Sequence, residues 1–514
     1  MTDLSSKTYT QILKSSIVIG GAQMINFLLT AVRVKFVAIL IGPLGVGLVS
    51  TYQSILEVLG TAAGLGIQQS AVRNVSQAIG SGDEVSIART ILTLRRISLI
   101  TGIAGAMVMI AVASKLSHYT FGTDEHTLNI SMLGLIILFS NISGGQTALI
   151  QGMRRIGDLA RMNVAGATVG TIVVVALYTW LGLKGIIPAL LSLSLIQLIF
   201  SWYFARKVAV PKVEMSWKES ILNAGGMLPL GLSFMWGGIL VAAVTYFTRT
   251  LIAQGYSLEA VGIYTAAFSL SGMFINFVLA AMAADYYPRL TAVAHEHNTM
   301  NQLVNEQTEI GLLLAVPGLL ATLTLAPWII RIFYTSQFLP AVVLLQWFIL
   351  GCLIRVLSWP MGYIILALGK GLEFAAIQTV FNVVHLALIL AGLNAIGLEG
   401  AAVAFFVAYL FSLALNLFVF RYLTGFKWSP PTSRLILTIF PIVAIAFFSG
   451  RMLPEWFATV GGLIFTVIVT VFCLRGLVQR IGSEHRIVQM SFRVPGMRWA
   501  CGLGKIRNFS DDLK

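Results

Sequence analysis

The chemically active side chains near the start of the chain form one polar stripe inside an apolar stretch. Six polar or small residues recur at a helical spacing and therefore share one face of a helix: Ser50, Gln53, Glu57, Thr61, Gly64 and Gln68. A charged side chain such as Glu57 costs about 2.5–3.5 kcal/mol at the centre of a bilayer, so it is expected to face a wet cavity or a partner. The stripe predicts a water-accessible helix face within a membrane.

Glu57 has two roles that the sequence leaves open. It is either a carboxylate that couples transport to a proton or cation, or the structural partner of Arg33 or Lys35 in the same bundle. A second carboxylate, Asp285, ends an apolar stretch at its cytoplasmic side, where we expect an interfacial residue rather than a gate. No nucleotide-binding loop, metal-ligand cluster or nucleophile–base arrangement occurs in the sequence. We therefore expect no enzyme activity, no cofactor and no metal.

The composition requires a membrane around these residues. Hydrophobic residues make up 57% of the 514 positions, charged residues 11%, and the mean hydropathy is +0.87. Apolar runs of about 20 residues, each able to cross roughly 30 Å of hydrocarbon, recur along the whole chain. These features exclude a water-soluble globular protein and predict an all-α polytopic membrane protein. The expected spans, about fourteen by this length criterion, are 15–40, 44–66, 92–113, 128–150, 162–182, 184–205, 221–248, 258–284, 308–330, 341–368, 372–396, 398–420, 433–450 and 457–478.

The formal charge of +14 is explained by topology. Most lysines and arginines lie in the connections on the side of the N-terminus, and few lie on the opposite side. The positive-inside rule then predicts that both termini are cytoplasmic. The basic surplus therefore does not indicate nucleic-acid binding.

An internal repeat organises the spans. Several patches come into register when the chain is shifted by 215 residues, for example Gly47 onto Gly262 and Arg206 onto Arg421. We predict two six-helix bundles of the same orientation, residues 1–210 and 211–425, because an even number of spans preserves the direction of insertion. Residues 426–478 add two C-terminal spans, and residues 479–514 form a basic cytoplasmic tail.

Four segments resemble a known family. The run from Lys35 to Val49, Gly60-Thr-Ala-Ala-Gly-Leu-Gly-Ile-Gln-Gln69, Tyr256-Ser-Leu-Glu-Ala-Val-Gly-Ile-Tyr264 and Tyr287-Pro-Arg-Leu290 are similar to Wzx-type flippases of O-antigen and enterobacterial common antigen units. The resemblance covers roughly residues 10–425. It places the chain in the superfamily of multidrug extrusion (MATE) transporters and the peptidoglycan-precursor flippase, the MOP superfamily. The two extra C-terminal spans depart from many members of the Wzx-type family.

The resemblance implies a substrate and a place in the cell. The substrate is a polyprenyl-pyrophosphate-linked oligosaccharide, moved by alternating access from the cytoplasmic to the periplasmic leaflet of the bacterial inner membrane. A polysaccharide polymerase and a chain-length regulator of the same pathway are implied partners. Such a substrate needs a hydrated, cationic cavity for its head and an opening to the lipid for its tail.

The intramembrane cations are the candidate phosphate contacts under this resemblance. They are Arg33, Lys35, Arg249 and Arg355. The repeat aligns Arg33 with Arg249 within one residue, and a guanidinium matches the bidentate geometry of phosphate. Arg33, Lys35 and Arg249 lie toward the ends of their spans, so reaching to the interface is the alternative for each.

Two polar side chains are the candidate glycan contacts. These are Gln53 in the first bundle and Asn276, which the repeat aligns with Thr61, in the second.

Three other functions compete with this one. A multidrug or cation antiporter of the same fold would need acidic cavity residues. A flippase for the peptidoglycan precursor lipid II also agrees with the extra spans. A membrane-embedded polymerase or glycosyltransferase is disfavoured, because the outer loops are too short to hold a catalytic domain.

Overall fold

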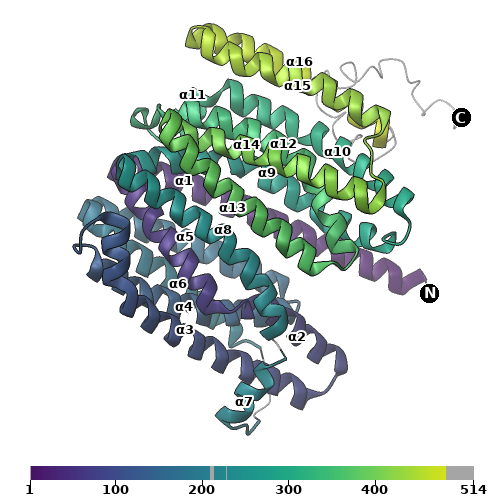
Figure 1. Ribbon diagram of the computed structural model, residues 1–514. Coiled ribbons are helices and arrows are strands. Elements are labelled where there is room, and N and C mark those ends of the chain that lie inside the picture. The colour runs from purple at the N-terminus through teal and green to yellow at the C-terminus, as the bar shows by residue number, and fades with distance from the viewer. Residues whose placement is uncertain (1, 209–212, 227, 482–514) are drawn as a thin grey trace, which may run out of the picture. The chain divides into compact units, whose positions relative to one another are not determined.

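The computed structural model of the chain describes residues 2–208, 213–226 and 228–481. These residues form helices and short connections, without a strand (Figure 1). They divide into two compact units. The first unit is Met1–Thr265 with Arg331–Phe338, and the second unit is Ala266–Ile330 with Leu339–Lys514. The predicted tail beyond residue 481 lies outside the described residues.

The first unit is a helical bundle. Helix α3 packs on α4, α1 packs on α5 and α8, and α6 packs on both α4 and α5. A buried apolar cluster that includes Tyr52, Met109, Leu133 and Tyr178 fills its interior. Its elements are α1 (Thr2–Gly64), α2 (Ile67–Ser81), α3 (Glu84–Phe121), α4 (Thr127–Gly152), α5 (Ile156–Leu181), η1 (Gly182–Gly185), α6 (Ile186–Ala205), α7 (Trp217–Ala224), α8 (Leu228–Gly255) and the start of α9 (Leu258–Ala292).

The second unit is also a helical bundle. Helix α10 packs on α12, α15 and α16, while α14 packs on α12 and α13. Its elements are the rest of α9, α10 (His297–Thr324), most of α11 (Ala326–Phe333), α12 (Ala341–Ala367), α13 (Gly371–Ile396), α14 (Leu398–Thr424), α15 (Pro430–Met452) and α16 (Glu455–Ile481). The short helix η2 (Ser336–Phe338) belongs to the first unit.

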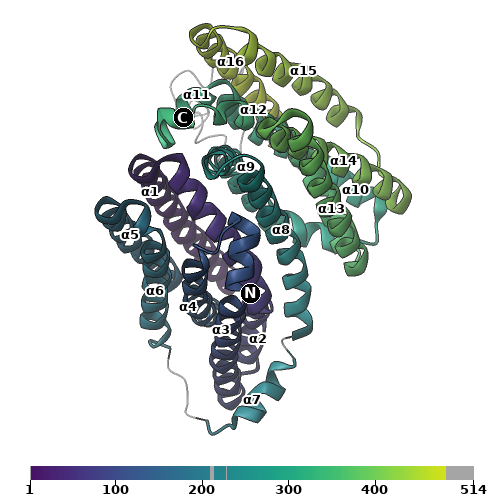
Figure 2. The ribbon, with the colours of Figure 1, turned by 60° about the vertical axis from the view of Figure 1, so that its left-hand side comes forward.

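Within the second unit, a buried carboxylate on α10 hydrogen-bonds to both C-terminal helices. Glu309 on α10 accepts a hydrogen bond from Thr432 Oγ1 of α15 at 2.7 Å and one from Arg480 Nε of α16 at 2.5 Å. A carboxylate in an apolar bundle is stable only when its oxygens are paired in this way. Helices α15 and α16 are the predicted additional spans (Figure 2).

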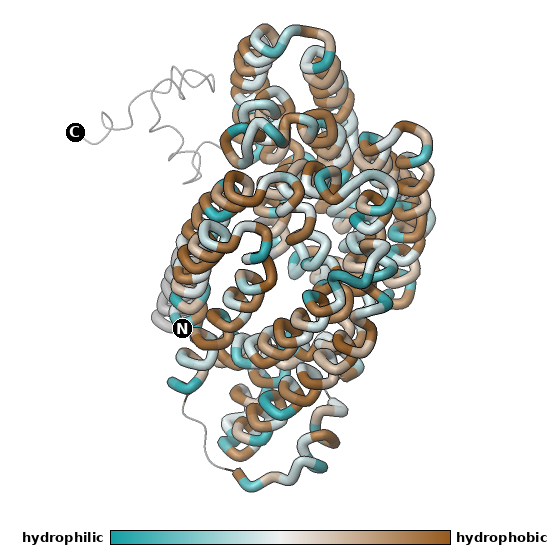
Figure 3. Tube along the Cα trace, turned by 90° about the vertical axis from the view of Figure 1, so that its left-hand side faces the viewer, coloured by the Kyte–Doolittle hydropathy of each residue, from teal (hydrophilic) through white to brown (hydrophobic). Residues whose placement is uncertain are grey.

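Twelve helical stretches of the described chain are long and apolar enough to cross a membrane. Two of them, Gly20–Gly64 and Ile156–Ala205, run 45 and 50 residues and each holds two legs, which agrees with the predicted number of spans. Hydrophobic residues dominate the lengths of the helices in Figure 3. The predicted all-α polytopic fold is confirmed.

The break expected between the spans 15–40 and 44–66 is a sharp kink at Gly42, where two helices meet within α1. Gly42 has φ 59° and ψ −168°, and Pro43 follows it, but helix continues on both sides of this point. Proline lacks the amide N–H that would bond back into the preceding turn, and only glycine adopts such a φ without strain. The predicted spans 15–40 and 44–66 are therefore two legs of one bent helix.

Residues that the repeat makes equivalent contact each other inside the first unit. A Cβ atom added to Gly47 would lie 1.8 Å from the Leu258 carbonyl oxygen, and one added to Gly262 would lie 2.0 Å from the Pro43 carbonyl oxygen. Three residues further along, Thr265 Oγ1 donates to Ser50 Oγ at 3.1 Å. Such reciprocal contacts are expected where equivalent segments meet on a pseudo-two-fold axis.

The compact units do not divide where the repeat predicts a domain boundary. The repeat begins its second copy at residue 211, whereas the units divide inside α9, after Thr265. The reason is that α8 packs on α1 and α2 of the first unit. The domains 1–210 and 211–425 stay a prediction from the sequence repeat, and the packing of the helices divides the chain differently.

Candidate functional site

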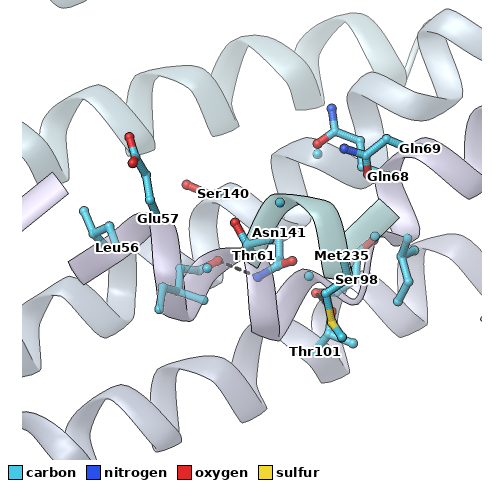
Figure 4. Close-up of a pocket in the computed structure, with 18 of the residues that line it drawn as sticks. Leu56, Glu57, Thr61, Gln68, Gln69, Ser98, Thr101, Ser140, Asn141 and Met235 are labelled. Atoms are coloured by element: carbon cyan, nitrogen blue, oxygen red, sulfur yellow. Dashed lines mark hydrogen bonds between the residues drawn. The ribbon is translucent and has the colours of Figure 1, made fainter. Parts of the chain in front are cut away.

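A polar cavity of about 620 Å³ lies inside the first unit. Residues of α1, α2, α3, α4 and α8 line it (Figure 4). Amide, hydroxyl and small side chains dominate its wall. The lining residues are Gln53, Leu56, Glu57, Gly60, Thr61, Gly64, Gly66, Ile67, Gln68, Gln69, Ser98, Thr101, Ile136, Ile137, Ser140, Asn141, Gly144, Gly145, Phe234, Met235 and Gly238.

The polar stripe of α1 forms one wall of this cavity. Gln53, Glu57 and Thr61 line it over two turns of the helix. In Figure 4, Glu57 lies toward one end of the view, Gln68 and Gln69 lie toward the other, and Thr61 is between them. Ser50, the first member of the stripe, is buried outside the lining and donates to the Gly47 carbonyl at 2.9 Å.

The end of α1 turns the chain so that α2 can also face the cavity. Leu65 and Gly66 have φ values of 48° and 61°, in the left-handed region. A Cβ added to Gly66 would lie 2.0 Å from the Gly231 carbonyl oxygen of α8, so only glycine permits this close approach. The turn leads directly into Gln68 and Gln69, whose side chains are exposed to the cavity.

Helices α3 and α4 complete the polar lining. Asn141 Nδ2 donates to the Ile137 carbonyl at 3.1 Å, drawn as a dashed line in Figure 4. An asparagine amide carries two donor hydrogens and an acceptor oxygen, so this bond leaves hydrogen-bonding capacity for a ligand. Ser98, Thr101 and Ser140 add hydroxyl groups. The wall is chemically suited to hydroxylated ligands.

Glu57 is the one charged residue among these lining residues. Arg249 of α8 interacts electrostatically with Glu57, a cation that the sequence did not suggest as its partner. Arg249 is 9% exposed, and its guanidinium donates to the Ser50 carbonyl at 2.8 Å. Its buried Nε has no hydrogen-bond partner in the described part of the chain. Arg249 thus sits behind the polar stripe rather than on the cavity wall.

The two cations of the first leg of α1 have different surroundings. Arg33 is half-buried and interacts electrostatically with Tyr178 of α5. Lys35 Nζ donates to the Arg331 carbonyl at 2.7 Å and to the Tyr334 carbonyl. A lysine at the last carbonyls of a helix compensates its negative end. Lys35 therefore holds the end of α11 against α1, and neither cation lines the cavity.

The remaining predicted residues belong to the second unit. Arg355 is half-buried on α12 and interacts electrostatically with Tyr409 and Cys352. Asn276 is exposed on α9. Asp285 is exposed and pairs with Arg289 one turn later at 3.2 Å.

Sequence reasoning missed the contributions of α3, α4 and α8. Ser140-Asn141 interrupts an apolar span, and that pair was a usable signal. Ser98 and Thr101 lie within another apolar span and gave a weaker one. Phe234 and Met235 carried no signal, because apolar residues in a span do not reveal which side they face.

The fold and the cavity define a class: a multi-pass helical membrane protein of the transporter type. The chain belongs to a family described as "Polysaccharide biosynthesis protein", which matches residues 36–343. It is 24% identical over 405 residues to the Lipid III flippase of Escherichia coli (strain K12), covering 75% of this chain and 92% of that protein. These findings confirm a polysaccharide-biosynthesis family, and the finer assignment to Wzx-type flippases stays a prediction.

Solved structures of low identity share the fold. The lipid II flippase MurJ in an inward closed conformation matches with a TM-score of 0.65 and 13% identity, over 91% of this chain and 99% of that one. An inward-facing MATE multidrug transporter of the MOP superfamily matches with a TM-score of 0.60 and 15% identity, over 82% and 99%. These relatives are named as flippases and transporters, which agrees with the prediction that the chain is not an enzyme. No group of histidine, cysteine and acidic residues able to hold a metal occurs among the described residues.

Proposed function

We propose that this protein is a flippase for a polyprenyl-pyrophosphate-linked oligosaccharide. It would move the glycan from the cytoplasmic to the periplasmic leaflet of the inner membrane by alternating access, with both termini in the cytoplasm. The observation that carries the proposal is the cavity lined by amides and hydroxyls in a membrane-spanning bundle. The family and the relative named as a lipid III flippase support the same substrate class.

The cavity suits the glycan part of this substrate. Each sugar hydroxyl both donates and accepts hydrogen bonds, and Gln53, Gln68 and Asn141 offer both kinds of group in one space. Glu57 adds a strong acceptor for hydroxyl donors. Asn276 of the second unit is proposed as a further glycan contact.

The pyrophosphate requires cations, which the cavity wall lacks. We assign this role to Arg33, Arg249 and Arg355, with Lys35 as a fourth candidate whose amine already holds two backbone carbonyls. Outward movement of one negative charge is favoured by about 2.3 kcal/mol per 100 mV of membrane potential, inside negative. This potential could drive transport without nucleotide hydrolysis. A polymerase and a chain-length regulator would receive the translocated unit.

A reconstituted transport assay tests the proposal. The purified protein in liposomes is given a lipid-linked oligosaccharide, and movement is followed by the access of an external glycan-binding protein. We expect transport that increases with an imposed potential and falls strongly in Gln53→Leu. Gln77→Leu, on an exposed face of α2 away from the cavity, is the matched control. Equal rates in liposomes with and without the protein would refute the proposal.

The phosphate contacts are tested separately. Alanine in place of Arg33, Arg249 or Arg355 should lower transport at normal expression, and lysine should restore part of it. Full transport by an alanine variant would remove that residue from the site.

One observation favours a second candidate function, a cation-coupled or drug antiporter. The charged residue on the cavity wall is an acid, Glu57, and an acidic cavity attracts cations. Efflux of a cationic dye from liposomes, lost in Glu57→Gln, would support this function. Transport of lipid-linked glycan without dye efflux would support the flippase.

A further inference from the structure

A second cavity, of about 410 Å³, lies at the N-terminal end of α3, whereas the first cavity meets this helix near its middle, at Ser98 and Thr101. Its wall consists of the first three turns of α3, the residue that caps them, and one residue of α7. None of these residues lines the first cavity. The lining residues are Asp83, Val85, Ser86, Arg89, Thr90, Thr93 and Asn223.

The length of α3 places this cavity outside the hydrocarbon. About 20 helical residues cross the apolar core of a bilayer, whereas α3 has 38 residues from Glu84 to Phe121. Its first turns carry several charged residues, and an 18-residue run without a charged residue begins after Arg96. The cavity around Arg89 therefore lies at the level of the lipid headgroups.

The wall carries opposite charges and an unsatisfied hydroxyl. Arg89 is exposed and makes no ion pair or hydrogen bond with the described residues. Thr93 is 1% exposed, and its hydroxyl oxygen has no hydrogen-bond partner in the described chain. Asp83 accepts the Val85 amide at 3.0 Å through one carboxylate oxygen, which leaves the other available. A buried hydroxyl without a partner is unusual and points to a missing ligand or water.

Helix α7 is held firmly over this end of α3 (Figure 2). The Arg96 guanidinium donates to the Met215 carbonyl at 2.8 Å, to the Ser216 carbonyl at 2.9 Å and to Ser220 Oγ at 2.8 Å. The same guanidinium lies 4.7 Å from the centre of the Trp217 ring. Asn223 therefore has a fixed position at the cavity.

The outer surface of α7 carries three large apolar side chains. Trp217, Ile221 and Leu222 are all exposed, on an arc of the helix that also holds Lys218. A short helix with such a face lies in the membrane interface with its apolar residues among the lipid chains. The cavity thus opens beside a surface that contacts lipid.

We propose that this second cavity binds the headgroup of a zwitterionic phospholipid of the phosphoethanolamine type. Arg89, with the hydroxyls of Ser86 and Thr93, would bind the phosphate, and Asp83 would bind the primary ammonium. An anionic headgroup would instead meet the repulsion of Asp83. The lipid chains would extend past the apolar face of α7, which distinguishes a phospholipid from a soluble phosphate ester.

Lipid retention tests the assignment. The full-length protein is placed in nanodiscs of equal parts phosphatidylethanolamine, phosphatidylglycerol and phosphatidylcholine, released, and analysed for bound lipid by native mass spectrometry. We expect wild-type protein to retain phosphatidylethanolamine preferentially and Arg89→Gln to retain at least fivefold less. Arg73→Gln, an exposed arginine on α2 that lines neither cavity, is the matched control and should retain the wild-type amount.

Two further variants separate binding from folding. Thr93→Val preserves side-chain volume and removes the hydroxyl, so it should lower retention at an unchanged melting temperature. Asp83→Asn should reduce the preference for phosphatidylethanolamine over phosphatidylglycerol. Equal retention of the three lipids by the wild type, or full retention by Arg89→Gln, would overturn the proposal. Displacement of the bound lipid by millimolar O-phosphoethanolamine supports the headgroup chemistry, while binding of that soluble ester with no retained lipid would overturn the phospholipid assignment.

Discussion

Replacing Gly47 with alanine tests whether the two copies of the repeat meet backbone to backbone. The added Cβ would lie 1.8 Å from the Leu258 carbonyl oxygen, although real Cβ atoms essentially never approach a neighbour within 3.0 Å. Helices α1 and α9 would therefore have to separate by roughly 1.2 Å at this point, since a backbone carbonyl cannot rotate away. Overpacking of this kind costs about 1–3 kcal/mol.

Helix propensity works in the opposite direction and sets the size of the effect. Alanine is more favourable than glycine within a helix by about 1 kcal/mol. We therefore expect Gly47→Ala to lower the free energy of unfolding by at most about 2 kcal/mol, which corresponds to a fall of a few degrees in melting temperature. Gly262→Ala should behave alike, because its Cβ would meet the Pro43 carbonyl at 2.0 Å.

The assay is thermal unfolding of the purified protein in detergent, together with the transport assay described above. Gly21→Ala is the matched control, because it lies in the same helix α1 and its Cβ would meet nothing within 4 Å. That variant should melt at or slightly above the wild-type temperature. Wild-type melting temperature and transport in both Gly47→Ala and Gly262→Ala would refute the close backbone contact.

Three further predictions follow from single contacts. Arg480→Gln leaves the Glu309 carboxylate without its cation, so we expect the free energy of unfolding to fall by roughly 2 kcal/mol. This is less than the 3–5 kcal/mol of fully buried pairs, because Arg480 is partly exposed. Limited proteolysis should cleave first near α16, and unchanged proteolysis would contradict this. Lys35→Met should lower the melting temperature by releasing the Arg331 carbonyl, whereas lost transport at wild-type stability would instead identify Lys35 as a phosphate contact. Burial lowers the pKa of His126 below 6.5, so the unfolded chain binds more protons than the folded one, and stability should fall as the pH drops below about 6.5. His126→Asn should reduce the dependence of the melting temperature on pH between pH 5 and 6.5. The same dependence in both proteins would exclude this histidine as the cause.

The local periodicity of the sequence predicted the first wall of the candidate site. Gln53, Glu57, Thr61 and Gln68 line one cavity as their helical spacing indicated. The prediction was possible because the side of a helix on which a residue lies depends only on the period of the helical backbone. The repeat likewise predicted that Gly47 and Gly262 are equivalent, although the sequence could not show that they touch.

The positions of the cations depended on packing between helices. In the sequence, Arg33, Lys35 and Arg249 look alike, because each is a basic residue within an apolar span. In the structure, Arg33 interacts with Tyr178, Lys35 binds the end of α11, and Arg249 binds the Ser50 carbonyl. The rotation of each helix against its neighbours decides these contacts. That rotation follows from the shapes of many side chains at once, and no local pattern encodes it.

The sequence by itself determined the all-α membrane class of the protein and the existence of a polar face around Glu57. Hydropathy and helical periodicity depend only on residues that are near each other in the sequence, so both can be read without knowledge of the fold. Only the tertiary structure decided that Glu57 interacts electrostatically with Arg249, that α3, α4 and α8 complete the cavity, and that α7 contributes Asn223 to a second one. These features join residues far apart in the chain, and the free energy that places them comes from packing that no single segment contains.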